Sequence, residues 1–303
     1  MELRCCYVLV DDGLGQYADM ACVSAASLKR LHPHLEVVLL CDTRTAEAIR
    51  RRAHPLGAIA DTIVAAAAPG PSVAERSRWL KTSLRRLVRG DLLYLDVDTV
   101  VVRPIDLHVD ARTHLLAAPD ACDAWGRPVQ ATESWVQRLF SLLAWTMPAL
   151  YRNAGVIFVR ESPAGRELGD RWHAEWLRSL AAGSHRDQPA LNAAIGAMPG
   201  AVGLLPLRYN AMPTYRPWLA RGARIYHFWS EQTLNLESPS SLLDHLTRQY
   251  QLTGAVDWPT LDWCRRHNYP WLRRHGIRVA LRAGAWRVAW GELIAVPAGR
   301  RQH

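Results

Sequence analysis

Two aspartates separated by a single residue interrupt an apolar run between Asp91 and Pro104, in the stretch DLLYLDVDTVVVRP. In a strand, residues two apart point the same way, so Asp96 and Asp98 are expected to project together from the end of a buried strand. Two carboxylates ~4 Å apart repel by about 4 kcal/mol at an effective dielectric of about 20, so the pair needs a cation. A hard divalent metal ion meets that need. The alternative is two exposed loop carboxylates without a ligand.

The elements that must position this pair alternate between strands and helices. The expected strands are Cys5–Val10, Leu35–Cys41, Asp61–Ala65, Asp91–Val97, Gly155–Val159, Val202–Leu207 and Ala223–Phe228. Continuous apolar strands separated by helices indicate an α/β fold whose parallel sheet is covered on both faces. Ligands bind such sheets at the carboxyl ends of the strands. The helix before the aspartates is expected to begin at Ser72, which has capping-box spacing to Glu75, and to end near Gly90.

One enzyme class with carboxylates at a strand end is the haloacid-dehalogenase-like phosphatases. Asp96, Asp98 and Val100 fit their D-x-D-x-[TV] pattern, in which the first aspartate is a nucleophile and the second a general acid. That pattern normally closes the first strand, whereas here about ninety residues of strand and helix precede it. The chain has only two lysines, Lys29 and Lys81, so no lysine follows the motif to hold a phosphoryl group.

A second class, the nucleotide-sugar glycosyltransferases of GT-A type, agrees with more segments. The chain resembles the family 8 retaining glycosyltransferases from about Tyr7 to Trp229. The matching segments, in the family's order, are YLDVDTVVV, RNAGVIFVR, DQPALN, LPLRYN and IYHF. The resemblance implies a GT-A fold, a mostly parallel Rossmann-like sheet flanked by helices. It also implies transfer of a hexose from a UDP-sugar to a saccharide or another hydroxyl acceptor.

The resemblance assigns the metal site. Asp96, Asp98 and His227 would bind Mn²⁺ or Mg²⁺, and the ion would bridge the two phosphates of the UDP-sugar. Transfer expels a nucleoside diphosphate, and a divalent cation neutralises the charge that develops on this leaving group. A single histidine in a strand is more often structural, so the assignment of His227 depends on its place in the family's last motif.

The resemblance also implies a set of donor-binding residues. They are Asp11, Asp12 and Tyr17 for the base and ribose, with Arg78, Asp96, Val97, Asn153, Ala154, Asp187 and Gln188 for the rest of the donor. Asp187 and Gln188 would be catalytic, with Gln188 near the anomeric carbon and same-face attack through an oxocarbenium-like state. Turn and helix-cap roles remain open for Asn153 and Gln188. A plain loop role remains open for Asp11 and Asp12.

The sequence departs from the family in three places. Family members usually continue the HF pair into a Gly-x-Lys-Pro-Trp segment whose lysine binds the diphosphate, but here Phe228 is followed by WSEQTLNL. The loop before Tyr17 is about two residues longer than usual, and Pro189 replaces the second aspartate of DQD. These differences keep open an inactive family member that binds a nucleotide or a partner protein without transfer.

The net charge of +9 is concentrated at the C-terminal end, where the stretch from Arg265 to His303 holds nine arginines and one acidic residue. Trp271–Trp290 has the pattern of one basic amphipathic helix with tryptophans, which predicts an anionic membrane surface as a partner. An ordinary surface helix is the alternative, and nucleic acid is a weaker candidate. The expected divisions are a GT-A catalytic domain at 1–250, with a nucleotide-binding half at 1–110 and a sugar/acceptor half at 111–250, and a basic, Trp-rich segment at 251–303.

Composition also bears on location. The chain has no apolar run of about 18 residues and no signal-peptide pattern, so we expect an unprocessed cytoplasmic protein, peripheral at most at the inner face of the membrane. The six cysteines form no C-x-x-C pair and are expected to be reduced and buried. The apolar stretch Ser134–Leu150 is expected to be a core or dimer helix, with an acceptor-site or membrane-facing lid as the alternative.

Overall fold

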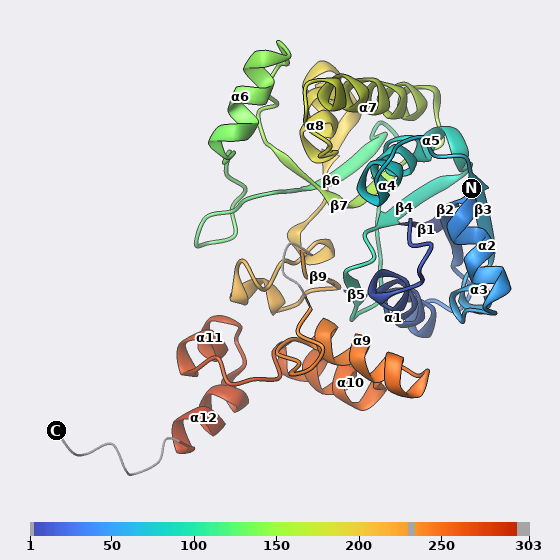
Figure 1. Cartoon of the computed structure of the whole chain (residues 1–303). Coiled ribbons are helices and arrows are strands. Elements are labelled where there is room, and N and C mark those ends of the chain that lie inside the picture. The colour runs from blue at the N-terminus through green and yellow to red at the C-terminus, as the bar shows by residue number, and fades with distance from the viewer. Residues whose placement is uncertain (1–2, 230–233, 296–303) are drawn as a thin grey trace.

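A seven-stranded mixed sheet lies at the centre of the protein (Figure 1). The computed structural model describes residues 3–229 and 234–295. The sheet order is β3-β2-β1-β4-β7-β6-β8, with β1 (Leu3–Leu9), β2 (Glu36–Asp42), β3 (Thr62–Ala66), β4 (Asp91–Leu95), β6 (Leu115–Pro119), β7 (Arg152–Val159) and β8 (Val202–Leu204). Strands β3, β2, β1 and β4 run parallel, β7 is antiparallel to β4 and β6, and β8 is parallel to β6. The prediction of a mostly parallel α/β sheet is confirmed, although β6 was not predicted.

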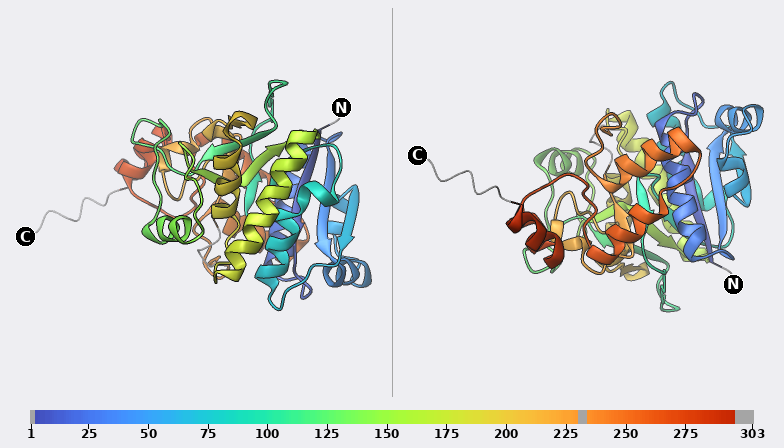
Figure 2. Two further views of the ribbon diagram at one scale, coloured as in Figure 1. Left: turned by 90° about the horizontal axis from the view of Figure 1, so that it is seen from above. Right: turned by 90° about the horizontal axis from the view of Figure 1, so that it is seen from below.

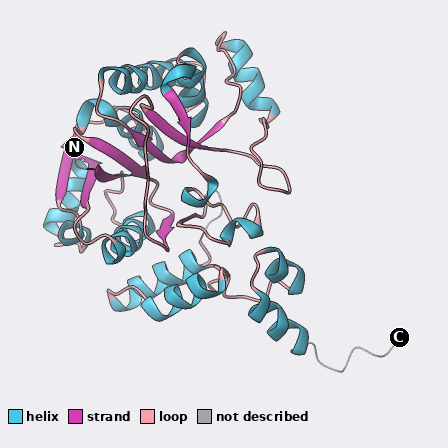
Figure 3. Ribbon diagram, turned by 180° about the vertical axis from the view of Figure 1, so that it is seen from behind, coloured by secondary structure: helices cyan, strands magenta, loops and turns pink. Residues whose placement is uncertain are grey.

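Helices cover both faces of the sheet, as Figures 2 and 3 show. One face carries α4 (Val73–Thr82), α5 (Leu84–Leu87), α7 (Pro163–Ala181) and α8 (Gln188–Ala197), and the other carries α1 (Gln16–Leu31), with α2 (Thr43–Arg51) and α3 (Leu56–Ile59) near the β3 edge. Along β1, Cys5, Tyr7 and Leu9 join the core beneath α1, whereas Cys6 and Val8 join the core beneath α4 and α7. Both faces of the strand are buried, so its sequence is continuously apolar.

Helix α4 begins where the sequence predicts and ends earlier. The hydroxyl of Ser72 accepts a hydrogen bond from the backbone N–H of Glu75 at 3.1 Å. The single helix expected to reach Gly90 is instead two helices, because Ser83 ends α4 and caps the start of α5. The Ser83 hydroxyl lies 3.2 Å from Nδ1 of His173 on α7. This break is therefore anchored against the neighbouring helix.

A separate two-stranded sheet completes the site region. Strand β5 (Thr99–Val101) pairs antiparallel with β9 (Ile225–His227), so Thr99 lies opposite His227. The strand expected at Ala223–Phe228 is present but belongs to this small sheet and not to the main one. The hydroxyl of Thr99 donates to the carbonyl of Asp96 at 2.8 Å, closing the turn that redirects the chain from β4 into β5.

Two predicted helices differ from the structure. Only the first half of Ser134–Leu150 is helical, as α6 (Ser134–Leu142). Leu142 at the end of this helix is 70% exposed, so the prediction of a core helix about four turns long was wrong. The prediction of one continuous helix over Trp271–Trp290 was also wrong. Gly284, at a left-handed φ of +70°, separates two short helices. They are α11 (Ile277–Arg282) and α12 (Trp286–Ile294).

The C-terminal helices pack against the body of the protein. Helix α9 (Leu242–Thr253) packs against α1, α10 (Trp258–His267) against α9, and α11 against the short 3-10 helix η3 (Pro217–Ala220). The remaining 3-10 helices are η1 (Pro199–Ala201) and η2 (Leu207–Tyr209). In residues 3–229 and 234–295, no helix combines the length and apolar character that crossing a bilayer requires. Arg300 and Arg301 of the basic segment lie outside the described residues, as do residues 230–233 of the WSEQTLNL stretch.

All six cysteines are buried free thiols, as the sequence predicts. Burial raises the pKa of Cys6 to about 12, so this thiol stays protonated at neutral pH. Such cysteines behave as small apolar residues of the core.

Candidate active site

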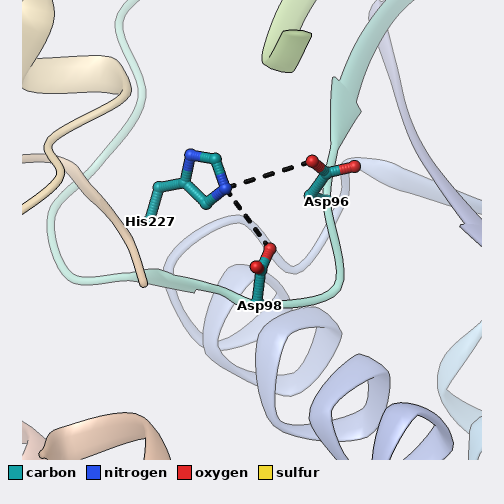
Figure 4. Close-up of side chains that lie close together, drawn as sticks. All are labelled: Asp96, Asp98 and His227. Carbon is teal, nitrogen blue, oxygen red and sulfur yellow. Dashed lines mark ion pairs between the residues drawn. The ribbon is translucent and has the colours of Figure 1, made fainter. Parts of the chain in front are cut away.

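Three potential metal ligands converge where β4 ends (Figure 4). Asp96 follows β4, Asp98 precedes β5, and His227 is the last residue of β9. Nε2 of His227 lies 3.4 Å from Oδ1 of Asp98 and 4.0 Å from Oδ2 of Asp96. One ligand atom from each residue lies within 4.8 Å of the other two. The geometry brings together the three residues that the resemblance assigned to the metal.

The hydrogen bonds behind His227 favour metal coordination by Nε2. Nδ1 of His227 lies 2.8 Å from Oδ1 of Asn210, and the amide of Asn210 donates to Oδ1 of Asn153 at 2.9 Å. This network assigns the proton to Nδ1 and leaves the lone pair of Nε2 facing the two carboxylates. Oδ1 of Asp98 is buried and has no hydrogen-bond donor among the described residues. Two carboxylates and one imidazole, oriented by a second hydrogen bond, fit a divalent metal ion.

Electrostatics in this cluster agree with a site for a cation. Burial by itself would lower the pKa of His227, but the negative charges of Asp98 and Asp96 raise it above its usual value. Burial would likewise raise the pKa of Asp98, but His227 beside it holds that pKa below its usual range. The cluster therefore stabilises positive charge between its carboxylates, as a metal site does.

Gly155 on β7 makes room for the imidazole ring. A Cβ atom at this position would lie 2.2 Å from Cε1 and 2.8 Å from Nε2 of His227. The carbonyl of Gly155 also accepts the backbone N–H of Asp96 at 2.8 Å. The same residue thus fixes one ligand through its backbone and admits another through its lack of a side chain.

Lys81 on α4 is a site residue that the sequence analysis did not assign. Its ammonium lies 3.0 Å from Oδ1 of Asp96 and 3.0 Å from Oδ2 of Asp187, and its side chain is almost completely buried. Arg78, one turn earlier, reaches Asp187 at 2.9 Å. Burial would raise the pKa of Asp187, but these two cations lower it. The spacing of Arg78 and Lys81 on one helix, three residues apart, was the available signal.

These groups line a cavity of about 570 Å³. Of the predicted site residues, those along its wall are Arg78, Asp96, Asp98, Asn153, Ala154, Asp187, Gln188 and His227. Gln188 begins α8, and its side-chain oxygen accepts the backbone N–H of Ala154 at 3.1 Å. Val97 points elsewhere and packs against the core beneath α1. Eight residues from distant segments are thus gathered around one cavity.

The residues expected at the base and ribose do not line this cavity. Asp11 accepts the backbone N–H of Gly15 at 2.9 Å, near the start of α1, and Asp12 lies 3.6 Å from Arg76. Tyr17 is 43% exposed and faces a different cavity of about 330 Å³, whose wall includes Phe228. Their contact with a nucleotide therefore stays a prediction.

A second group of residues in the lining of the 570 Å³ cavity was not assigned from the sequence. We call the first group the metal-side wall, comprising Lys81, Asp96, Asp98, Asp187 and His227, and the second the α6-side wall, comprising Glu133, Trp135, Tyr215 and Trp229. The guanidinium of Arg186 lies 4.9 Å from the centre of the Trp135 ring, and the indole N–H donates to Glu133. Asp120 also lines the cavity, and burial raises its pKa. No local motif marks these residues, because they come from loops and the start of a short helix.

Solved structures with this fold are glycosyltransferases. Galactosyltransferase LgtC, in complex with donor and acceptor sugar analogs, has a TM-score of 0.52 and 19% identity, covering 76% of this chain and 87% of that one. Mouse xyloside xylosyltransferase 1 has a TM-score of 0.50 and 13% identity, covering 77% of this chain and 99% of that one. The glycosyltransferase GlyE of Streptococcus pneumoniae has a TM-score of 0.54 and 16% identity, covering 91% of this chain and 67% of that one.

These similarities confirm the GT-A fold that the sequence predicts. No protein-family model matches the chain, and no curated protein sequence matches it either. At such low sequence identity, the shared fold does not by itself assign a reaction. The residues of the cavity are therefore what can indicate the reaction.

Proposed function

We propose that the protein is a metal-dependent retaining glycosyltransferase that moves a hexose from a UDP-sugar to a hydroxyl acceptor. The observation that carries the proposal is the cluster of Asp96, Asp98 and His227 in the wall of a large cavity, at the end of β4. A divalent cation bound there would neutralise the diphosphate that leaves during transfer. The segments that resemble family 8 enzymes support the retaining stereochemistry and the hexosyl donor.

The metal-side wall is suited to hold a donor sugar. Arg78 and Lys81 neutralise Asp187, which makes this carboxylate a hydrogen-bond acceptor for sugar hydroxyls and a weak nucleophile. The side-chain oxygen of Gln188 is occupied by the N–H of Ala154, so its amide N–H groups remain to donate. Same-face attack needs no separate carboxylate base, because the departing phosphate oxygen accepts the proton of the acceptor hydroxyl.

Lys81 can supply the positive charge that family 8 enzymes take from a lysine after the HF pair. In this chain a buried ammonium approaches the metal cluster from α4, where it lies beside Asp96. If the metal binds Asp96 in place of Lys81, the ammonium becomes available to stabilise negative charge on a bound donor. The inactive-member alternative is weakened, since both the metal ligands and a cationic group are in place.

The phosphatase alternative is not favoured. Its motif closes the first strand, whereas Asp96 follows the fourth strand in the chain, and β4 has an antiparallel neighbour in β7. The structures that share this fold are glycosyltransferases.

We further propose that the two predicted halves meet at this cavity. Residues 1–110 supply Lys81, Asp96 and Asp98, and residues 111–250 supply Asp187 and His227. Metal and donor would then both contact the two halves, with 251–303 as a basic segment that packs on the core beneath α1. The buried free thiols support a reducing compartment, the cytoplasm, as the place of action.

Calorimetry and hydrolysis together test the proposal. We expect UDP to bind in the presence of Mn²⁺ and to bind much more weakly when the metal is chelated. UDP-galactose and UDP-glucose should then be hydrolysed slowly without an acceptor, and NMR of the early product should show the anomeric configuration of the donor. Metal-dependent UDP binding without turnover of any UDP-sugar would favour the inactive member, and release of phosphate from simple monoesters would favour the phosphatase.

A further inference from the structure

Helix α12 exposes large apolar side chains that cover nothing in the described residues. Trp286 is 66% exposed, Trp290 64% and Ile294 66%, and Leu293 between them is 51% exposed. At about 100° per residue, these four positions fall within about 100° of arc on one face of the helix. Soluble proteins rarely leave such side chains grouped on their surface without a partner.

The other side of α12 accounts for its attachment to the protein. Ala285 and Ala289 are 3% exposed and belong to the core that continues beneath α1. Val288 packs against the same core from the edge. The helix is therefore docked through small residues and turns its largest apolar side chains outward, the reverse of an ordinary surface helix.

Positive charge is concentrated in the segment that contains this outward face. Residues 265–295 contain seven arginines and one acidic residue, Glu292, which lies 3.9 Å from Arg274. Arg278 and Arg282 on α11 and Arg287 on α12 are exposed, and none of the three forms an ion pair within the described part of the chain. Exposed tryptophans beside unpaired arginines match the interface of an anionic bilayer, where the indole rings lie at headgroup level.

We infer that the outward face of α12, formed by Trp286, Trp290, Leu293 and Ile294, docks on an anionic lipid bilayer, with the arginines of α11 and α12 contacting headgroups. Helix α12 lies on the side of the molecule that also carries α6, away from β3 (Figures 1 and 2). Helix α11 packs against η3, which follows Tyr215 of the α6-side wall. Bilayer binding would thus hold the protein through the same side that forms the less enclosed wall of the cavity.

Vesicle sedimentation with the full-length protein tests this inference. The protein should bind vesicles with about 30% phosphatidylserine and not vesicles of phosphatidylcholine alone, and binding should weaken as NaCl rises from about 50 to about 500 mM. The double variant Trp286→Ser/Trp290→Ser should lower the partition coefficient at least about tenfold. Leu293→Ser should lower it less. A matched control is Leu252→Ser, because Leu252 is also exposed, at 65%, but lies on α9 outside this face.

The same variants show whether the partner of this face is a bilayer or a second copy of the protein. Unchanged vesicle binding by the double variant, or an equal loss in Leu252→Ser, would overturn the inference. So would a dimer that forms without lipid and dissociates in the double variant by analytical ultracentrifugation, since a second copy would then cover the face. Thermal unfolding of each variant shows whether the fold is kept. Vesicle binding does not require transfer activity, so it is independent of the proposed reaction.

Discussion

The two walls of the cavity are built in opposite ways. On the metal-side wall, Lys81, Asp98, Asp187 and His227 are 2% to 6% exposed, and each lies within 3.4 Å of an oppositely charged or titratable partner. On the α6-side wall, Tyr215 is 45% exposed and Trp229 43%. Catalytic groups are held by neighbours that fix their positions, whereas a surface that must admit a second substrate can stay open. The contrast suggests that the chemistry of the donor is fixed and that the acceptor meets the more adaptable side.

The largest effect is expected from the metal ligands. Asp96→Asn and Asp98→Asn should each reduce transfer by about 10³-fold or more and abolish metal-dependent UDP binding, because a neutral amide cannot balance the charge of the cation. The fold should persist, since asparagine keeps the size of the side chain. Asp110→Asn, at an exposed loop position, is the control. Turnover assays and calorimetry with UDP measure the predicted losses. Normal transfer in either variant would rule out the proposed role of the metal-side wall.

A smaller loss is expected when the space beside His227 is filled. Gly155→Ala places a methyl group 2.2 Å from Cε1 of His227, so the ring must move away from the two carboxylates. Displacing a ligand or its support typically costs about 10- to 100-fold in metal affinity. Gly200→Ala is a matched control, because a Cβ there has open space and Gly200 has no positive φ. Equal Mn²⁺ affinity in the two variants would show that His227 is not a ligand.

Two residues of the metal-side wall, Asp96 and Asp98, were predictable because their signal is local. The D-x-D pair stands at the end of an apolar strand, and the order of β1 to β4 follows from alternating strands and helices. His227 and Asp187 needed the resemblance, since no spacing rule links them to Asp96. Lys81 was missed because its role depends on where α4 lies over the sheet, which is a tertiary property.

The α6-side wall could not be predicted for the same reason. The stretch Ser134–Leu150 was interpreted as a core or dimer helix, with an acceptor-site or membrane-facing lid as the alternative, but the chain leaves the helix after Leu142. At Ala144 the backbone takes a positive φ of 52°, which ends the helical path. The tail was misjudged in a similar way, because Gly284 divides an apparently continuous pattern into two helices.

The α6-side wall should affect the acceptor and not the donor. If Trp135 stacks on an acceptor sugar, Trp135→Ala should raise the KM for the acceptor about tenfold, or about 1.4 kcal/mol. Hydrolysis of the UDP-sugar without acceptor should change by less than about twofold. Trp125→Ala is the matched control, since Trp125 is 83% exposed and is not part of the cavity wall. The acceptor in this test is a hexoside that turns over in a panel of methyl and nitrophenyl glycosides. If Trp135→Ala lowered hydrolysis of the UDP-sugar as much as it lowered transfer, the proposed distinction between the walls would be wrong.

The last effect is on stability and not on transfer, and it concerns the support behind the metal-side wall. His173 on α7 lies 2.8 Å from the hydroxyl of Thr82, the residue next to Lys81, and burial lowers the pKa of His173 to about 4. In the unfolded chain a histidine has a pKa of about 6.5, so between about pH 6.5 and 4 the unfolded state binds more protons than the folded state. The stability that the neutral ring contributes is therefore full above about pH 6.5 and is lost as the pH falls towards 4.

A His173→Gln variant isolates this contribution. Relative to the variant, the wild-type protein should lose on the order of 2 kcal/mol of unfolding free energy between pH 7 and 4, a value reduced for partial solvent screening. Denaturant unfolding at several pH values measures the difference, in which the other titrating groups largely cancel. Identical pH slopes for the two proteins would mean that His173 is protonated in the fold as readily as in water. The wall that holds Lys81 would then have a solvated support and not a buried one, and its contrast with the α6-side wall would be weaker than the geometry indicates.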